Sequence, residues 1–234
     1  MLGTLMRRAA LVLALALTAP ASAHAAVHRY VLGHTPQGRP ITAIERGDPS
    51  ATRRLLVFGM IHGNEPAGRA IARKLAATSP PPGLDVWVVE DLNPDGLAAR
   101  TRGNAGGVDL NRNFPYRWRH LGGVFYSGTG PLSERESRIA HDLILRVKPS
   151  VTVWYHQHLD VVDTASGDKR IERRYARLVG MRTGALPRYP GSAPTWQDHA
   201  FPSSTAFVVE LAAGALAPKA VARHVRALFT IATG

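Results

Sequence analysis

The stretch Leu55-Leu-Val-Phe-Gly-Met-Ile-His-Gly-Asn-Glu-Pro66 joins a short apolar run to a histidine and a glutamate. Residues 55–58 have the pattern of a buried strand, and Pro66 stands where a helical apolar pattern begins, which is typical of proline in a first helical turn. His62 and Glu65 therefore lie at the carboxyl end of a predicted strand. A histidine and a glutamate three residues apart in such a turn point to the same side, so both can reach one metal ion.

Two later apolar runs also end directly on a residue that can do chemistry. Residues 151–155 lead into His156, and residues 206–209 lead into Glu210. In open parallel α/β sheets, ligands bind outside the carboxyl ends of the strands. Because an open catalytic metal site uses three protein groups and a water molecule, we expect His156 to be the third ligand.

His158 is an alternative third ligand. It lies two residues beyond His156 and shares the same side of the chain if the extended geometry continues. His156 is preferred because it directly ends the apolar run.

Glu210 ends an otherwise apolar strand, where an unpaired carboxylate is unfavourable. It is therefore either paired with a cation or placed as a base near a metal-bound water. Zinc lowers the pKa of its bound water to about 7, so a nearby carboxylate can take that proton and return it to a leaving amine. The pattern thus predicts a zinc hydrolase, with a structural ion pair as the alternative for Glu210.

Between Leu55 and Glu210 the chain resembles the zinc metallocarboxypeptidases (M14-like), and within them the bacterial murein peptide amidases. The most specific matching segments are residues 62–65, 93–96, 101–115 and 207–210. The resemblance implies one Zn²⁺ ion per chain, held by His62, Glu65 and His156, with Glu210 as general base and acid.

The resemblance also assigns residues around the ion. Arg102 matches the arginine that polarises the scissile carbonyl, and Asp109 matches the carboxylate that orients the first zinc histidine. An arginine in a glycine-rich loop suits the stabilisation of developing negative charge.

Three further residues are expected to bind substrate. Asn111 and Arg112 match the pair that grips the substrate carboxylate, and a planar guanidinium fits a carboxylate with two hydrogen bonds. Tyr189 stands at a place comparable to the family's mobile tyrosine, although the segment that follows departs from the family in length and composition.

The first 25 residues have the composition of a signal peptide. Arg7 and Arg8 follow the initial residues, an apolar run covers residues 9–19, and small residues precede cleavage sites after Ala23 and Ala25. The apolar run is too short for a membrane span. We expect a secreted, periplasmic or wall-associated protein, with residues 26–234 forming one catalytic domain. The ordinary secretory route is preferred, and the twin arginines Arg7 and Arg8 indicate a folded-export route as the alternative.

The composition also limits the possible partners. The chain has no cysteine, which excludes a disulfide framework and a lipid anchor on cysteine, and its formal net charge is +12. Such a surface attracts anionic polymers, which a bacterial wall supplies. The arginines are scattered and are not interleaved with aromatic residues, so we expect no nucleic-acid partner, and no obligate protein partner is evident.

The predicted architecture is a three-layer α/β/α domain with a mixed, largely parallel central sheet. An opening hairpin covers residues 27–43, and the capping box Ser133-Glu-Arg-Glu136 begins a helix. Residues 93–130 are expected to be mostly irregular and functional. Other strands are predicted at residues 55–60, 84–90, 151–155 and 206–209, and other helices at residues 66–77, 169–181 and 218–231.

The predicted activity is hydrolysis of a peptide or isopeptide bond next to a free carboxylate, most specifically in murein peptides. Asp160, Asp163 and Asp198 lie in or next to segments that flank the expected pocket. Each is expected to be a solvated loop carboxylate, and the alternative is that one of them meets the additional ammonium group of diaminopimelate. One alternative is a zinc deacylase of the aspartoacylase and succinylglutamate desuccinylase type. The other is a wall-binding module that lost catalysis, which requires a missing ligand or base, and none is missing.

Overall fold

An eight-stranded mixed sheet runs through the protein in the order β1-β2-β4-β3-β5-β8-β6-β7. We describe residues 26–234 from a computed structural model, so the predicted signal peptide lies outside the described residues. The central strands β4, β3, β5 and β8 are parallel, whereas β2 and β6 pair antiparallel at either side of them. The strands are β1 (Ala26–His34), β2 (Pro40–Gly47), β3 (Arg53–Phe58), β4 (Leu84–Val89), β5 (Val151–Gln157), β6 (Val161–Asp163), β7 (Arg182–Gly184) and β8 (Thr205–Leu211).

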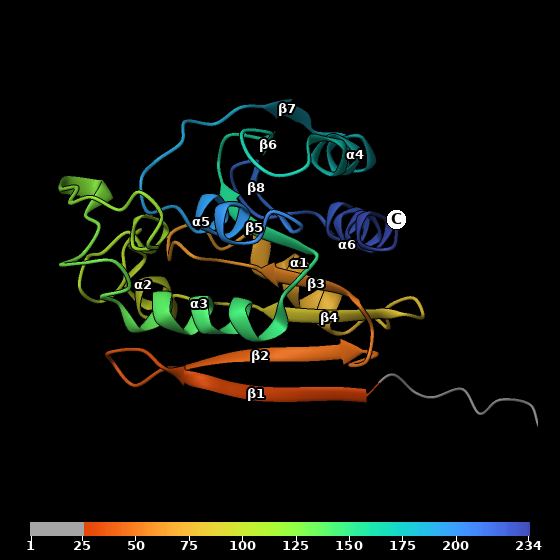
Figure 1. Ribbon diagram of the computed structural model, residues 1–234, viewed down its shortest axis with the longest axis horizontal. Coiled ribbons are helices and arrows are strands. Elements are labelled where there is room, and N and C mark those ends of the chain that lie inside the picture. The colour runs from red at the N-terminus through yellow and green to blue at the C-terminus, as the bar shows by residue number, and fades with distance from the viewer. Residues whose placement is uncertain (1–25) are drawn as a thin grey trace, which may run out of the picture.

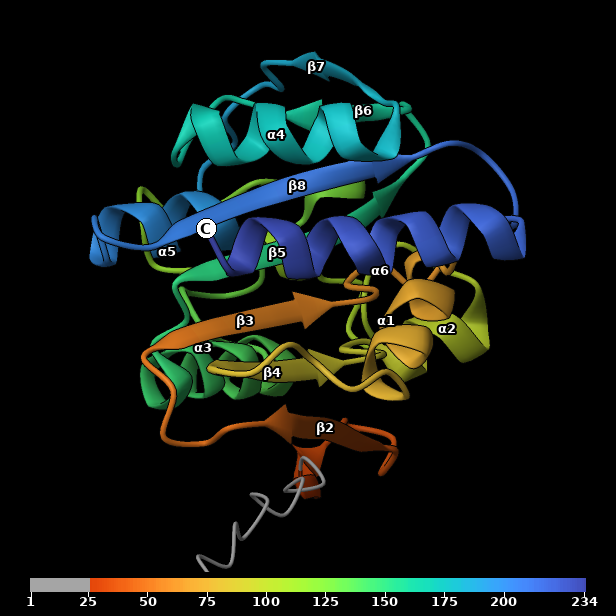
Figure 2. The ribbon, with the colours of Figure 1, turned by 90° about the vertical axis from the view of Figure 1, so that its right-hand side faces the viewer.

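Helices cover both faces of this sheet and make three layers (Figures 1 and 2). On one face lie α1 (Gly68–Ala76), α4 (Lys169–Val179) and α6 (Pro218–Ala232), and on the other lie α3 (Arg135–Val147) and α5 (Ala193–Ala200). The short α2 (Pro94–Ala99) follows β4. Within residues 26–234 we find no helix with the length and apolarity needed to cross a membrane. The three-layer α/β/α prediction is confirmed.

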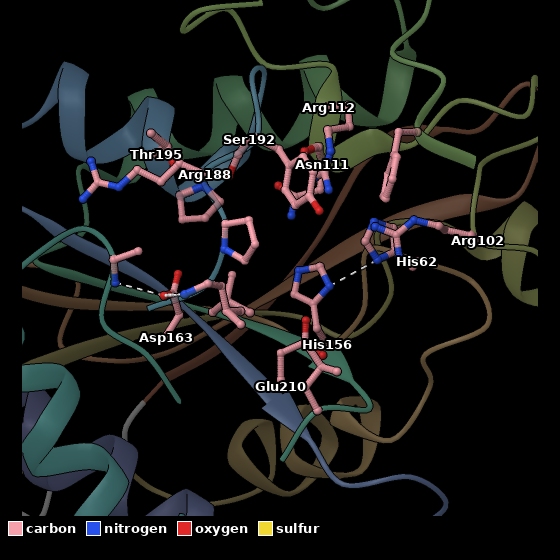
Figure 3. A pocket seen from close by; sticks show the side chains of 18 residues that line it. His62, Arg102, Asn111, Arg112, His156, Asp163, Arg188, Ser192, Thr195 and Glu210 are labelled. Carbon is pink, nitrogen blue, oxygen red and sulfur yellow. Dashed lines mark hydrogen bonds between the residues drawn. The ribbon is translucent and has the colours of Figure 1, made fainter. Parts of the chain in front are cut away.

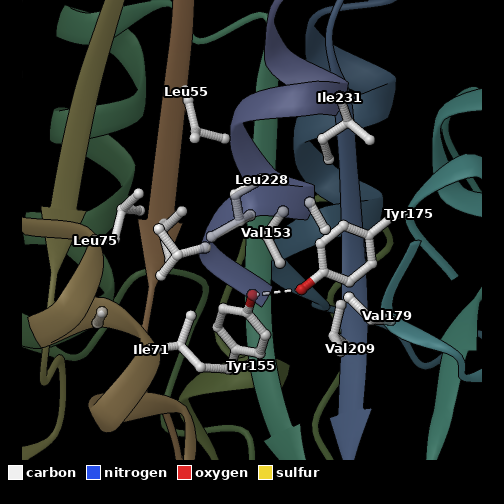
Figure 4. Close-up of a cluster of buried hydrophobic side chains, with 14 of the residues drawn as sticks. Leu55, Ile71, Leu75, Val153, Tyr155, Tyr175, Val179, Val209, Leu228 and Ile231 are labelled. Atoms are coloured by element: carbon white, nitrogen blue, oxygen red, sulfur yellow. Dashed lines mark hydrogen bonds between the residues drawn. The ribbon is translucent and has the colours of Figure 1, made fainter. Parts of the chain in front are cut away.

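Each face of the sheet carries its own apolar cluster, because the central strands are buried on both sides. The cluster under α1, α4 and α6 contains Leu55, Val153 and Val209 (Figure 4). Trp154 and Val208 pack in the cluster on the face of α3 and α5. The core is therefore divided by the sheet into two layers.

The alternation of side chains along β5 and β8 places the two polar residues at their ends. Trp154 and Val208 face the α5 side, so the residues two positions further, His156 and Glu210, face it too. These two residues are also direct partners in the parallel register of β5 and β8. The sheet therefore brings a potential ligand and a potential base to one side of its carboxyl edge.

The helix that follows Gly130 begins differently from the prediction. Glu134 is at the N-cap position and makes no capping hydrogen bond, so the predicted capping box is wrong. The Ser133 hydroxyl instead accepts a hydrogen bond from Asn113 Nδ2 at 2.9 Å, and the buried Glu136 accepts one from Asn104. Tertiary contacts with the preceding loop therefore replace the local cap.

Candidate metal centre

The side chains of His62, Glu65 and His156 converge at the carboxyl edge of the sheet. Figure 3 shows the two histidines of this set close together. Glu65 Oε2 lies 3.0 Å from His62 Nδ1 and 2.9 Å from His156 Nδ1. The two Nδ1 atoms are 3.1 Å apart. All three residues are buried, so the polar atoms meet away from bulk solvent.

This donor set fits a metal ion. The His62 Nε2 atom lies 2.8 Å from Asp109 Oδ1, and donation of a hydrogen bond there leaves Nδ1 with its lone pair. A carboxylate behind a histidine in this way is a common support for a metal ligand. Two imidazole nitrogens and one carboxylate oxygen suit zinc and leave a fourth position for water.

His158 does not belong to this set. It is exposed and lines a different cavity, so the structure brings His156 and not His158 to the two ligands from the β3 turn. Gln157 separates the two histidines, and its backbone N–H donates to Glu65 Oε2 at 3.3 Å. The polypeptide turns away from the ligand set after this contact.

Arg102 bridges the two carboxylates of the centre. Its Nε donates to Asp109 Oδ2 at 3.0 Å, and one terminal nitrogen donates to Glu65 Oε1 at 2.9 Å. Burial alone raises the pKa of Asp109, but His62 and the nearby arginines hold it well below its usual range. Burial likewise raises the pKa of Glu65, and the two histidines lower it far more. Both carboxylates therefore stay ionised and can face a cation.

The short segment Asn93-Pro-Asp-Gly96 holds the ligand turn in place. Asn93 Nδ2 donates to the carbonyl oxygens of Ile61, at 3.2 Å, and Arg102, at 3.4 Å. Gly63 packs against Gly96 so closely that an added Cβ would lie 2.0 Å from the Gly96 carbonyl carbon. The sequence marks this segment as a matching motif without a role, and the structure shows that it connects the ligand turn with the Arg102 loop.

An open cavity of about 280 Å³ adjoins the ligand set. Glu210 lines it beside His156, and Figure 3 shows the two side chains close together. The Glu210 Oε2 atom is buried and has no hydrogen-bond partner among the described residues. Since no described cation pairs with Glu210, the structural ion-pair alternative has no support in the described chain.

Arg112 and Asn111 form another wall of the same cavity. The Arg112 guanidinium lies 4.0 Å from the centre of the Tyr189 ring, and its Nε is buried without a hydrogen-bond partner among the described residues. Asn111 Oδ1 accepts a hydrogen bond from the Ala193 backbone at 2.9 Å, which fixes the amide group. This wall therefore presents donors to the cavity.

Phe125 is a cavity residue that sequence analysis missed. Its ring stacks on Tyr189 with centres 5.2 Å apart, and the Arg112 guanidinium lies 5.1 Å from the Phe125 ring. Its position in a glycine-rich loop gave only a weak signal. Both rings therefore pack against the Arg112 guanidinium at the wall of the cavity.

Of the three aspartates considered for an ammonium group, only Asp163 lines this cavity. Its Oδ1 accepts hydrogen bonds from the backbones of Ala165 and Leu186, both at 2.9 Å. Asp160 is exposed outside the cavity, and Asp198 accepts from the Ala206 backbone and lines a separate depression. The alternative of a contact with the ammonium group is therefore wrong for Asp160 and Asp198, because the turn after β5 and the end of α5 direct them elsewhere.

Comparison with known proteins agrees with this fold. Residues 10–174 match the family described as "Protein of unknown function (DUF2817)". Murein peptide amidase A of Escherichia coli (strain K12) is 33% identical over 130 residues, which cover 49% of this chain and 54% of the relative. Carboxypeptidase SOL1 of Arabidopsis thaliana is 33% identical over 102 residues, covering 37% of this chain and 21% of that protein. The chain thus aligns with about half the length of the murein amidase and less of the plant protein.

Solved structures show the same fold over most of the chain. The murein-tripeptide amidase of Escherichia coli O157 superposes with a TM-score of 0.69 at 25% identity, covering 88% of this chain and 92% of that one. Carboxypeptidase A of Helicoverpa armigera gives a TM-score of 0.72 at 18% identity, covering 88% and 68%. The chain therefore belongs to the DUF2817 family, and its fold is similar to that of the murein-tripeptide amidase and of carboxypeptidase A.

Proposed function

We propose that this protein is a zinc metallocarboxypeptidase that hydrolyses a peptide or isopeptide bond next to a free carboxylate. The observation that carries the proposal is the convergence of His62, Glu65 and His156 in one buried set beside Glu210. The relatives named murein peptide amidase and carboxypeptidase support the same reaction class.

The chain's own residues divide the reaction between them. Bound at the ligand set, zinc supplies a Lewis acid that lowers the pKa of water and polarises a carbonyl. Glu210 takes a proton from the attacking water and returns it to the nitrogen of the leaving amine. Arg102, which keeps a partly exposed guanidinium at the cavity, donates to the carbonyl oxygen as negative charge develops there.

Substrate is held on the wall opposite to the ligands. Arg112 and the Asn111 amide bind the free carboxylate of the leaving residue, with Tyr189 covering them. When that carboxylate binds, the Tyr189 ring either moves away from the Arg112 guanidinium or keeps its contact with it beside the substrate. This places the scissile bond between Arg112 and the ligand set.

We extend the proposal to murein peptides that contain γ-D-glutamyl-diaminopimelate. Diaminopimelate carries a second amino-acid centre, and Asp163 offers a carboxylate in the same cavity as Arg112. The similarity to murein peptide amidase A supports this choice over ordinary carboxyl-terminal residues. Export from the cytoplasm through residues 1–25 would bring the protein to such a substrate, and a fractionation of cells with and without those residues tests that part.

The two other candidates have less support. A deacylase of the aspartoacylase type shares the metal ligands, but the named relatives at 33% identity are a murein peptide amidase and a carboxypeptidase. A wall-binding module without catalysis would lack a ligand or the base, whereas His62, Glu65, His156 and Glu210 are all present and close together.

The test offers the purified protein a murein tripeptide and, separately, blocked dipeptides with free carboxyl termini. We expect rapid release of diaminopimelate, loss of activity with a chelator, and recovery on addition of zinc. Release of plain hydrophobic or basic residues with the tripeptide intact would replace the murein assignment with an ordinary carboxypeptidase. Full activity in a metal-free preparation would contradict the metallopeptidase itself.

A further inference from the structure

A second cavity, of about 720 Å³, also touches the ligand set, and we call it the Arg73 groove. Glu65, Arg102, Arg73 and His158 are among the residues that line it. Arg102 lines this groove and the first cavity alike, whereas His62, His156 and Glu210 line the first cavity. The two cavities therefore meet at Arg102 and lie on different sides of the ligand set.

The division of residues between the cavities gives the groove its place along a bound peptide. In the proposed function, on which this inference rests, Asn111 and Arg112 hold the leaving residue in the first cavity. A peptide that crosses the ligand set must then place the part before the scissile bond, the acyl side, in the Arg73 groove. No other described cavity contains one of the metal-ligand candidates.

The chemistry of the groove favours an anionic group. Its apolar surface comes from Pro66, Ala67 and Leu216. Glu65 is the one carboxylate in its lining, and it is already bonded to both ligand histidines and to Arg102. A substrate in the groove therefore meets no uncommitted acid among the lining residues.

Three side chains in the groove, Arg73, His158 and the exposed Asn64, have donors that make no hydrogen bond with another described residue. Arg73 contacts Glu90 through Nε at 3.0 Å, and the described residues leave its two terminal nitrogens without a hydrogen bond. His158 is exposed and has no hydrogen bond with another described residue. His158, which does not belong to the metal-ligand set, thus lines the Arg73 groove.

We infer that the Arg73 groove recognises a carboxylate on the acyl side of the scissile bond, with Arg73 and His158 as its donors. A γ-linked D-glutamyl residue carries a free α-carboxylate at that place, because its side-chain carboxyl forms the peptide bond. An α-linked residue has no carboxylate on its main chain there. The groove thus selects γ-linked over α-linked peptides and acts on specificity rather than on bond cleavage.

The test compares two murein tripeptides that differ only at the D-glutamyl α-carboxylate, one free and one converted to a carboxamide. We expect kcat/KM of the wild-type protein to be about tenfold or more higher for the free acid, since a hydrogen bond to a charged group is worth roughly 1.5–3 kcal/mol. The difference should appear mainly in KM, because the contact forms before the bond breaks.

Variants then assign the effect to the groove. Arg73→Gln and His158→Gln should lower kcat/KM for the free acid and leave the carboxamide peptide close to its wild-type value. Arg177→Gln, an exposed arginine on α4 that lines neither cavity, is the matched control for a lost surface charge and should change neither peptide. The metal content of each variant should equal that of the wild type.

The outcomes separate the inference from the function on which it rests. Equal kcat/KM for the two tripeptides in the wild type would overturn the inference and leave the murein peptidase intact. A preference for the free acid that both groove variants keep would also overturn it. Hydrolysis of neither tripeptide would contradict the proposed substrate, and the inference would fall with it.

Discussion

Two groups of buried carboxyl groups in this protein have opposite properties. The ligand cluster consists of Glu65 and Asp109, which surround the metal-ligand histidines. The acid cluster consists of Asp163 on β6, Glu172 on α4 and Asp198 on α5. Asp163 and Glu172 are buried, and Asp198 is half-buried with its Oδ2 atom out of contact with solvent. Burial raises the pKa of every one of these groups.

Partners reverse that effect only in the ligand cluster. There, the two ligand histidines lower the pKa of Glu65 below its usual range. His62 and the nearby arginines do the same for the pKa of Asp109. In the acid cluster, neither Glu172 oxygen has a hydrogen-bond partner among the described residues, and the pKa of Glu172 rises to about 8. The pKa of Asp198 rises to about 6. The comparison teaches that cationic neighbours, and not burial, decide whether a buried carboxyl group stays ready to bind a cation.

The largest expected effect comes from removing a ligand. Glu65→Ala should abolish metal binding and hydrolysis, because two histidines alone leave an incomplete site. Glu172→Gln is the control, since it changes a buried carboxyl group of the acid cluster and should retain the metal. Metal analysis of the two purified variants is the measurement, and retention of stoichiometric zinc by Glu65→Ala would remove the distinction between the clusters.

The second prediction concerns Glu210, which lies beside the ligand cluster without belonging to it. Glu210→Gln should keep the metal and the fold but lower kcat by about 10²–10⁴-fold, the usual range for general acid–base catalysis. Steady-state kinetics on the tripeptide and metal analysis of the same sample decide the matter. Loss of metal together with activity would make Glu210 a ligand instead of a base.

The third prediction concerns Asp109, the carboxylate that contacts the metal-ligand candidate His62, and its contribution to metal affinity. Its Oδ1 contacts His62, and its Oδ2 accepts from Arg102, so Asp109→Asn removes the charge and keeps the shape. We expect metal affinity to fall about 10- to 100-fold, the usual range for such supports. Competition with a metal-binding dye measures it. An unchanged affinity would show that His62 is oriented by its backbone alone.

Local sequence patterns predicted part of the fold and of the candidate site. The short apolar runs that end at His156 and Glu210 predicted β5, β8 and two of the candidate site residues, because an apolar run and the residue that follows it are both local features of the sequence. Strands β6 and β7 have three residues each, which is too short for a periodic pattern, so they were missed. Asp160 immediately precedes β6, whereas Asp198 lies on α5, so the position of neither relative to the cavity could be predicted from a local pattern.

Contacts between segments that are distant in the chain could not be predicted from the sequence. The bridge from Arg102 to Glu65 joins residues 37 positions apart, and the stacking of Phe125 on Tyr189 joins two loops. The acid cluster could not be predicted either, because its members come from different elements that only the folded chain brings together. Glu172 has the place of an ordinary helix residue, and only the packing of α4 against the sheet buries it.

The smallest expected effect tests the acid cluster directly. The pKa of Glu172 is about 8 in the folded protein, compared with 4.5 as its ordinary value. Between pH 5 and pH 8 the unfolded chain therefore releases a proton that the folded protein keeps. Binding of more protons by the folded state means that its stability falls as pH rises through this window.

Glu172→Gln cannot release that proton, so the variant should lose less stability between pH 5 and pH 8 than the wild type. The loss of unfolding free energy between the two pH values should be about 2 kcal/mol smaller in Glu172→Gln than in the wild type. The full pKa shift of Glu172 corresponds to a larger free energy, and relaxation of the surrounding residues reduces it. The ligand cluster does not interfere, because carboxyl groups with lowered pKa values lose their contribution only below about pH 4.5. Urea unfolding at both pH values measures the free energies. Parallel losses in the two proteins would mean that Glu172 is ionised in the folded state, and the two clusters would then differ in position but not in charge.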